Sequence, residues 1–262
     1  MSVSSLLSAR SARQGTPPTA AVPRDLTPLN KVPRGAESGI IGVRMMDPES
    51  GELLEVESAV ARLSRMRRRV HAWAEVLDQW MQSIGHGWRL VMIGLTYADG
   101  DTWKPGDIRE YLQELRRCAG DGLGGYAWVA ETQARGAIHY HVMALVRAGT
   151  DIPLPDKSGM WSHGSSKVKS ADSVWYLVTY VGKEYQKGGL PKGARMFAVW
   201  ISRGLVGRMG TWRLRLSALP AWLRSVLSET EECRVTREPG GGWRVGKDIR
   251  RSRWRVLGFV YA

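Results

Sequence analysis

The sequence is poor in cysteine and has no long apolar run, and each absence excludes a class of protein. Its two cysteines, Cys118 and Cys233, form no CxxC or other metal-binding motif, so we expect no disulfide framework and a reducing environment. The longest apolar runs, such as residues 90–95, are far too short to cross a bilayer, and no apolar signal segment follows Arg10 and Arg13. These absences predict a soluble, cytoplasmic protein with no membrane partner.

A nucleotide-binding loop of the G-x-x-x-x-G-K-[ST] type is also absent from the sequence, so ATP-driven unwinding of nucleic acid is not expected of it. Lysine is scarce, with nine of the 38 basic residues, and arginine supplies the rest. Against 25 acidic residues the net charge is +13, which indicates a polyanionic partner. The arginine fork suits phosphate contacts and base stacking, although GC-rich coding produces the same excess without any function.

The composition divides the 262 residues into four segments. Residues 1–40 are rich in Ser, Pro, Ala and Arg and predict a disordered basic tail, and residues 41–87 hold an amphipathic basic helix. Residues 88–203 carry the alternation of strands and helices expected of a catalytic core. Residues 204–262 combine a short helix with basic, Trp- and Arg-rich strands.

The predicted helix that begins near residue 60 has an apolar stripe at spacings of three and four residues. The stripe comprises Leu63, Met66, Val70, Trp73, Leu77, Trp80 and Ile84. Five arginines surround its beginning, at positions 62, 65 and 67–69. A solvated basic face is favoured over a dedicated DNA-contacting helix.

Strands are predicted at residues 88–97, 126–132, 138–146 and 196–202, and within 234–260 around a run of three glycines. Helices are predicted from Pro105 to Arg116, from a capping Asp172 to about residue 186, and at 219–227. This order favours an α+β fold, with a central antiparallel sheet of about five strands covered by helices.

The strand at 138–146 carries two histidines on one face. His139 and His141 are two residues apart, and strand side chains alternate between faces, so both imidazoles project from the same side of the sheet. If residues 133–136 form a tight turn, the hairpin brings Glu131 beside them. Two imidazoles and a carboxylate suit Mn²⁺ or Mg²⁺. The pattern also occurs as surface histidines on an amphipathic strand.

The predicted helix after residue 172 carries two tyrosines on one face. Tyr176, Tyr180, Lys183 and Lys187 are spaced four, three and four residues apart, which places them together. A phenol has a pKa of ~10, and a nearby metal or ammonium group favours the phenolate that a nucleophile requires. The alternative is that these tyrosines only pack.

Together these residues resemble the HUH endonuclease superfamily, specifically rolling-circle replication initiators (Rep proteins) of plasmids and single-stranded DNA phages. Residues 90–97 are similar to the hydrophobic first motif, and His139-Tyr140-His141 to the metal-binding motif. Tyr180-Val-Gly-Lys183 matches the Y-x-x-K nucleophile motif. The resemblance covers roughly residues 88–203, and it implies that the histidine motif lies on a central strand.

The resemblance implies a mechanism. Glu131, His139 and His141 would hold Mn²⁺ or Mg²⁺ at the scissile phosphate. Tyr180 would attack and form a 5′-phosphotyrosine, freeing a 3′-OH for rolling-circle replication, and religation would later need no ATP. Lys183 would balance charge. Some members use two tyrosines one helical turn apart, so Tyr176 is a candidate second nucleophile, although Tyr180 alone has the motif lysine.

Further residues are candidates for contacts around the site. His163, in the segment WSHG, is either an accessory phosphate or metal contact or, as we favour, a residue that structures its loop. The C-terminal tryptophans and arginines either stack bases and track phosphates or form a core beneath a charged exterior. The basic residues expected to bind DNA are Lys187, Arg195, Arg203, Arg250 and Arg253.

The expected partners are a single-stranded DNA origin and the helicase and polymerase of a bacterial host. An HUH transposase or relaxase would share the chemistry, but relaxases usually have three histidines and an N-terminal tyrosine. A noncatalytic nucleic-acid-binding module is the alternative from another class. Glu131 argues against it, because a carboxylate repels phosphate unless a cation intervenes.

Overall fold

The computed structural model describes residues 40–50, 53–98, 103–182, 189–191, 193–225, 227, 233–237, 243–245, 248–250 and 255–261. All but the last residue of the predicted basic tail lies outside the described residues, as do Lys183, Lys187 and Arg253. None of the described helices is long and apolar enough to span a bilayer.

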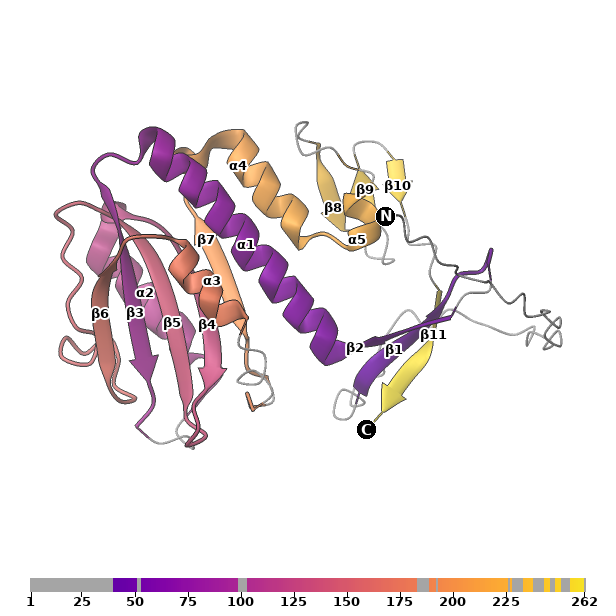
Figure 1. Cartoon of the computed structure of the whole chain (residues 1–262), viewed down its shortest axis with the longest axis horizontal. Helices are drawn as coiled ribbons and strands as arrows, with labels where there is room; N and C mark the ends of the chain where they lie inside the picture. Colours follow the sequence, from indigo (N-terminus) through magenta and orange to yellow (C-terminus); the bar gives the residue numbers. More distant parts are fainter. Residues whose placement is uncertain are drawn as a thin grey trace, which may run out of the picture.

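A five-stranded antiparallel sheet forms the centre of the molecule (Figure 1), in the order β6-β3-β5-β4-β7. Its strands are β3 (Trp88–Thr96), β4 (Leu123–Thr132), β5 (Ile138–Arg147), β6 (Ser166–Ala171) and β7 (Phe197–Ile201). The α+β class and the antiparallel central sheet are therefore confirmed. β5 occupies the middle position, so both of its neighbours, β3 and β4, can contribute side chains to one site.

A tight turn joins β4 to β5 and fixes their register. The Gln133 amide donates to Ala137, the Gly136 amide donates to Gln133, and Gly136 has a φ of 83°, a conformation that glycine adopts without strain. This register places Glu131 directly opposite His139.

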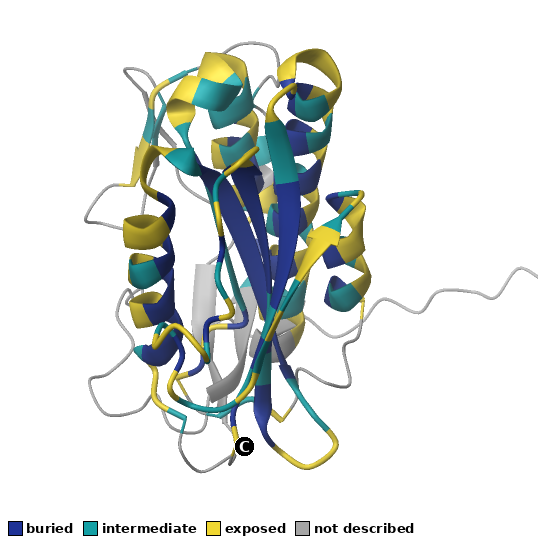
Figure 2. Cartoon of the chain, turned by 90° about the vertical axis from the view of Figure 1, so that its left-hand side faces the viewer, coloured by how far each residue is buried: buried dark blue, intermediate teal, exposed yellow. Residues whose placement is uncertain are grey.

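Helices cover both faces of the sheet, and the strands between them are its most buried part (Figure 2). Apolar residues of α2 (Asp107–Ala119) pack on one face with Val91, Ile93 and Leu95. On the other face, α1 (Ser58–Ile84) and α3 (Trp175–Val181) pack on Met92, Met143 and neighbouring side chains, and α4 (Arg203–Ala218) lies against α1.

Several predicted boundaries were wrong. α2 begins two residues after Pro105, which lies in the preceding turn. Asp172 does not cap the tyrosine helix: α3 begins at Trp175, and the Trp175 amide donates instead to the Ser173 hydroxyl. α5 spans only Ala221–Arg224. β6 and α4 were not predicted.

The arginines of α1 do not form a purely solvated face, contrary to the favoured interpretation. The guanidinium groups of Arg62, Arg68 and Arg69 donate to the backbone carbonyls of Ala194, Ser217 and Leu214, respectively. These arginines hold α1 against the segments that follow β7.

Two small sheets complete the described chain. One has the order β11-β1-β2, from β1 (Ile40–Met46), β2 (Leu53–Glu57) and β11 (Arg255–Tyr261), and brings residues near both chain ends together (Figure 1). The other has the order β10-β9-β8, from β8 (Val235–Arg237), β9 (Trp243–Val245) and β10 (Asp248–Arg250). The C-terminal strands were predicted, whereas β1 and β2 were not.

Candidate active site

The two histidines of β5 lie side by side on the face of the sheet that α1 and α3 cover. The centroids of the His139 and His141 rings are 4.4 Å apart, and the rings are inclined by 75°. Met143 and Leu145 continue the same face of β5 into the core beneath α1. The histidines therefore stand where this apolar face gives way to a partly exposed, polar region.

Thr96, the last residue of β3, orients His139. It lies directly opposite His139 across the β3–β5 pair, and its Oγ1 is 2.6 Å from Nδ1 of the imidazole. A hydrogen bond at one ring nitrogen fixes the tautomer and the ring orientation of a metal-binding histidine. This contact therefore makes Nε2 the nitrogen through which His139 would bind a cation.

Glu131 supplies a buried carboxylate from β4. It lies opposite His139, but it leans along the strand so that its Oε2 is 3.0 Å from Nε2 of His141. Only 5% of Glu131 is exposed. A carboxylate at this depth requires a polar or cationic partner to offset its desolvation.

The donor set of these three residues fits a hard divalent cation. Ligands of Mg²⁺ lie about 2.1 Å from the ion, so two adjacent ligands of an octahedral site are about 3 Å apart. The contact between His141 and Glu131 has this separation. In the described part of the chain no three His, Cys, Asp or Glu side chains converge on one point. Binding by all three residues would therefore require one of them to turn.

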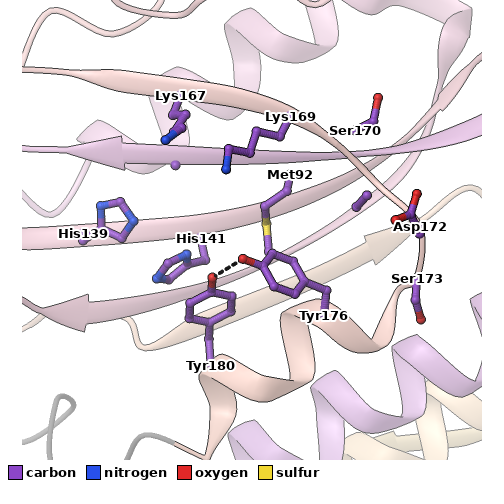
Figure 3. A pocket seen from close by; sticks show the side chains of 12 residues that line it. Met92, His139, His141, Lys167, Lys169, Ser170, Asp172, Ser173, Tyr176 and Tyr180 are labelled. Carbon is purple, nitrogen blue, oxygen red and sulfur yellow. Dashed lines mark hydrogen bonds between the residues drawn. The ribbon is translucent and has the colours of Figure 1, made fainter.

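Tyr180 of α3 lies directly on the histidine pair. Its ring stacks on the His141 imidazole with a centroid separation of 3.6 Å and an interplanar angle of 24°. The Tyr180 hydroxyl donates a hydrogen bond of 2.8 Å to the hydroxyl of Tyr176, one helical turn earlier (Figure 3). The phenols, the imidazoles and Glu131 are thus on the same side of the sheet.

The environment of Tyr180 opposes its ionisation. Burial raises the pKa of the phenol above its usual value, and the hydrogen bond to Tyr176, the charge of that neighbour and the charge of Glu131 raise it further. The phenol is therefore protonated at neutral pH in this environment. A positive charge beside the hydroxyl would be needed to reverse the effect.

A cavity of about 530 Å³ opens beside the histidines and tyrosines (Figure 3). Its lining joins three elements, β3, β6 and α3, to the histidines of β5: Met92, Gly94, His139, His141, Lys167, Lys169, Ser170, Ala171, Asp172, Ser173, Tyr176 and Tyr180. Lys167 and Lys169 were not predicted as site residues, because β6 was interpreted as a loop. Their alternation with Ser166, Val168 and Ser170 was the available signal.

His163 does not join the histidine pair. Its ring lies 5.4 Å from that of Tyr97 and 4.8 Å from that of Trp161, both members of the core on the α2 side. Its Nε2 is 3.8 Å from the buried carboxylate of Asp107, and its carbonyl accepts from the Ala98 amide. These contacts support the loop-structuring interpretation.

The other predicted DNA contacts are not brought to the cavity. Arg195 and Arg203 are exposed and flank β7, at the sheet edge opposite β6. Arg250 lies in β10 of a separate small sheet.

Residues 90–185 match the family model of the replication-associated protein ORF2. This segment begins in β3 and contains β4, β5, β6 and α3, so it includes every residue that lines the site. The resemblance to replication proteins is confirmed over this segment. Searches of curated proteins and of solved structures gave no match.

Proposed function

We propose, from the match of residues 90–185 to a replication-associated protein family, that this chain initiates replication by nicking single-stranded DNA. The match supports a role in DNA replication. The nicking chemistry is inferred from the site. The observation that carries it is the stacking of Tyr180 on His141, which is itself hydrogen-bonded to Glu131.

The side chains divide the work of the reaction. Glu131, His139 and His141 would hold Mn²⁺ or Mg²⁺, which when bound supplies positive charge to the scissile phosphate and to the phenol. Tyr180 attacks phosphorus, so a bond forms between its Oη and phosphorus while the bond from phosphorus to the 3′-oxygen breaks. The phenol loses its proton and the departing oxygen gains one. The products are a 5′-phosphotyrosine and a free 3′-OH.

The reverse reaction religates the strand, because the phosphotyrosine conserves the energy of the broken bond. The 3′-OH meanwhile serves as a primer. The sequence has no nucleotide-binding loop, so the host helicase would unwind the duplex and the host polymerase would extend the primer.

Tyr180 is assigned as the nucleophile because its ring touches His141, whereas Tyr176 is 49% exposed and contacts Tyr180. Tyr176 would take up the hydrogen bond of the phenol or serve as a second nucleophile. Lys183, in the Y-x-x-K motif, would balance charge at the phosphate.

The test is adduct formation with a mixture of labelled single-stranded DNAs and Mn²⁺. We expect a covalent protein–DNA band that persists in a denaturing gel and disappears with EDTA. Tyr180→Phe should abolish it, because no other group replaces the attacking oxygen, and Tyr176→Phe is the matched control one turn away.

An adduct that survives in Tyr180→Phe and vanishes in Tyr176→Phe would reverse the assignment of the nucleophile. No adduct from the folded wild-type chain, with DNA binding that EDTA does not change, would instead indicate a noncatalytic binding module.

A further inference from the structure

Two lysines of the edge strand β6 face the candidate active site. Lys167 and Lys169 alternate along the strand, both line the cavity, and both side chains reach over the sheet toward the histidines (Figure 3). Lys167 is opposite Gly94 on β3, and Gly94 is opposite His141 on β5. Lysine, glycine and histidine therefore form one row across three strands.

Gly94 keeps this row open. A Cβ atom at Gly94 would lie 3.2 Å from Cε1 of His139 and 4.0 Å from Cβ of Lys167. Any side chain larger than hydrogen would occupy the space between the lysines and the histidine pair. The absence of a side chain thus leaves a passage from the sheet edge to the site.

The charges in the cavity fit an anionic strand. Among the described residues of the lining, Lys167 and Lys169 are the cations, both are exposed, and neither forms an ion pair within the described part of the chain. Asp172, the carboxylate of the lining, follows β6 at the end away from the histidines. A phosphate is therefore favoured at the histidine end.

Lysines on edge strands also serve to prevent sheets from pairing with one another. That role requires only solvent exposure. It does not explain why both ammonium groups extend over the face that carries His139 and His141, next to a glycine that keeps the way clear.

We propose that Lys167 and Lys169 bind successive phosphates of a single DNA strand, which enters over β6 and passes Gly94 to reach Tyr180. The exposed ring of Tyr176, on the opposite wall, offers a surface on which a base stacks. This inference rests on the proposed function, and it names the path by which the substrate reaches the site.

The test is binding of a random-sequence single-stranded oligonucleotide to the full chain in EDTA, measured by fluorescence anisotropy over a range of salt concentrations. Each phosphate contact contributes about 0.7 to the slope of log affinity against log salt, so Lys167→Gln/Lys169→Gln should lower the slope by about 1.4. Lys167→Arg/Lys169→Arg should restore it, which excludes misfolding as the cause.

The matched control is Lys104→Gln/Lys157→Gln, which removes two exposed lysines that do not line the cavity. Its slope should equal that of the wild type. A wild-type slope in Lys167→Gln/Lys169→Gln, or an equal decrease in the control, would overturn the inference. Because no chemistry occurs in EDTA, this result is independent of the covalent adduct, whose absence would count against the proposed function alone.

Discussion

At the scale of single residues, the hydroxyl of Thr96 holds the His139 ring by its Nδ1 atom, 2.6 Å away. His139 can approach a cation shared with Glu131 and His141 only through its other nitrogen. Thr96 is therefore a positioning residue, which acts on the site through the histidine that it orients. A threonine at the end of a strand carries no such signal in the sequence, because the partner of its hydroxyl depends on the pairing of β3 with β5.

We expect Thr96→Val to raise the Mn²⁺ concentration needed for half-maximal adduct formation by about 10–100-fold, the usual effect of losing such an outer hydrogen bond. Valine keeps the shape of threonine, so the fold should be unchanged. The measurement is a Mn²⁺ titration of the adduct at saturating DNA. An adduct that is lost at every Mn²⁺ concentration would show that Thr96 does more than position His139.

Thr132→Val is the matched control for this prediction. Thr132 ends β4, beside Glu131, and its buried hydroxyl has no hydrogen-bond partner within the described part of the chain. Removing it should leave the Mn²⁺ dependence as it is in the wild type. An equal shift in both variants would mean that the effect comes from the sheet rather than from the bond to His139.

At the scale of elements, α1 is fastened to α4 by arginines. Arg69 donates to the Leu214 carbonyl and, at 3.1 Å, to the Ser217 hydroxyl, and Arg68 donates to the Ser217 carbonyl at 2.8 Å. The last carbonyls of a helix have no partner within it, so these arginines satisfy groups that α4 leaves open. Burial, and then repulsion from Arg68, lower the pKa of Arg69.

Arg69→Met should lower the free energy of unfolding by about 1.5–3 kcal/mol, the usual worth of a hydrogen bond to a charged group. Methionine retains most of the apolar contact of the arginine stem, so the loss reports the hydrogen bonds. Urea denaturation measures it. Arg65→Met, one turn earlier at an exposed position, should change stability by less than about 0.5 kcal/mol. Equal losses would refute the role assigned to the α4 carbonyls.

The same contacts explain why the sequence misled about α1. A run of arginines predicts a solvated face, and the carbonyls that accept from them lie far away in sequence, at separations of 149 and 145 residues. α4 itself was missed because glycines at 204, 207 and 210 weaken a helical pattern, and Gly207, with a φ of 63°, kinks it. β6 is short and polar, so only its pairing with β3 identifies it as a strand.

At the scale of the molecule, the predictable part of the site is the part that depends on local spacing. His139 and His141 share a face because strands alternate, and Glu131 meets them because a tight turn follows it. The position of α3 over that face, which brings Tyr180 onto His141, depends on how its buried residues Leu177 and Val181 pack on the sheet. The sequence predicted the class of the fold but not β1, β2 or their pairing with β11.

This pairing separates the chain ends from the candidate site. All residues that line the cavity lie between 92 and 180, whereas β11 pairs with β1 in a different sheet. A chain that stops after Trp254 lacks β11 and leaves β1 as a free edge. We expect backbone amides of β1 to exchange hydrogen faster in this chain, while those of β3, β4 and β5 keep their protection and the adduct yield at saturating DNA stays at the wild-type level. A truncated chain that keeps this protection but forms no adduct would show that β11 contributes to the chemistry, and the site would then have to be larger than the central sheet and α3.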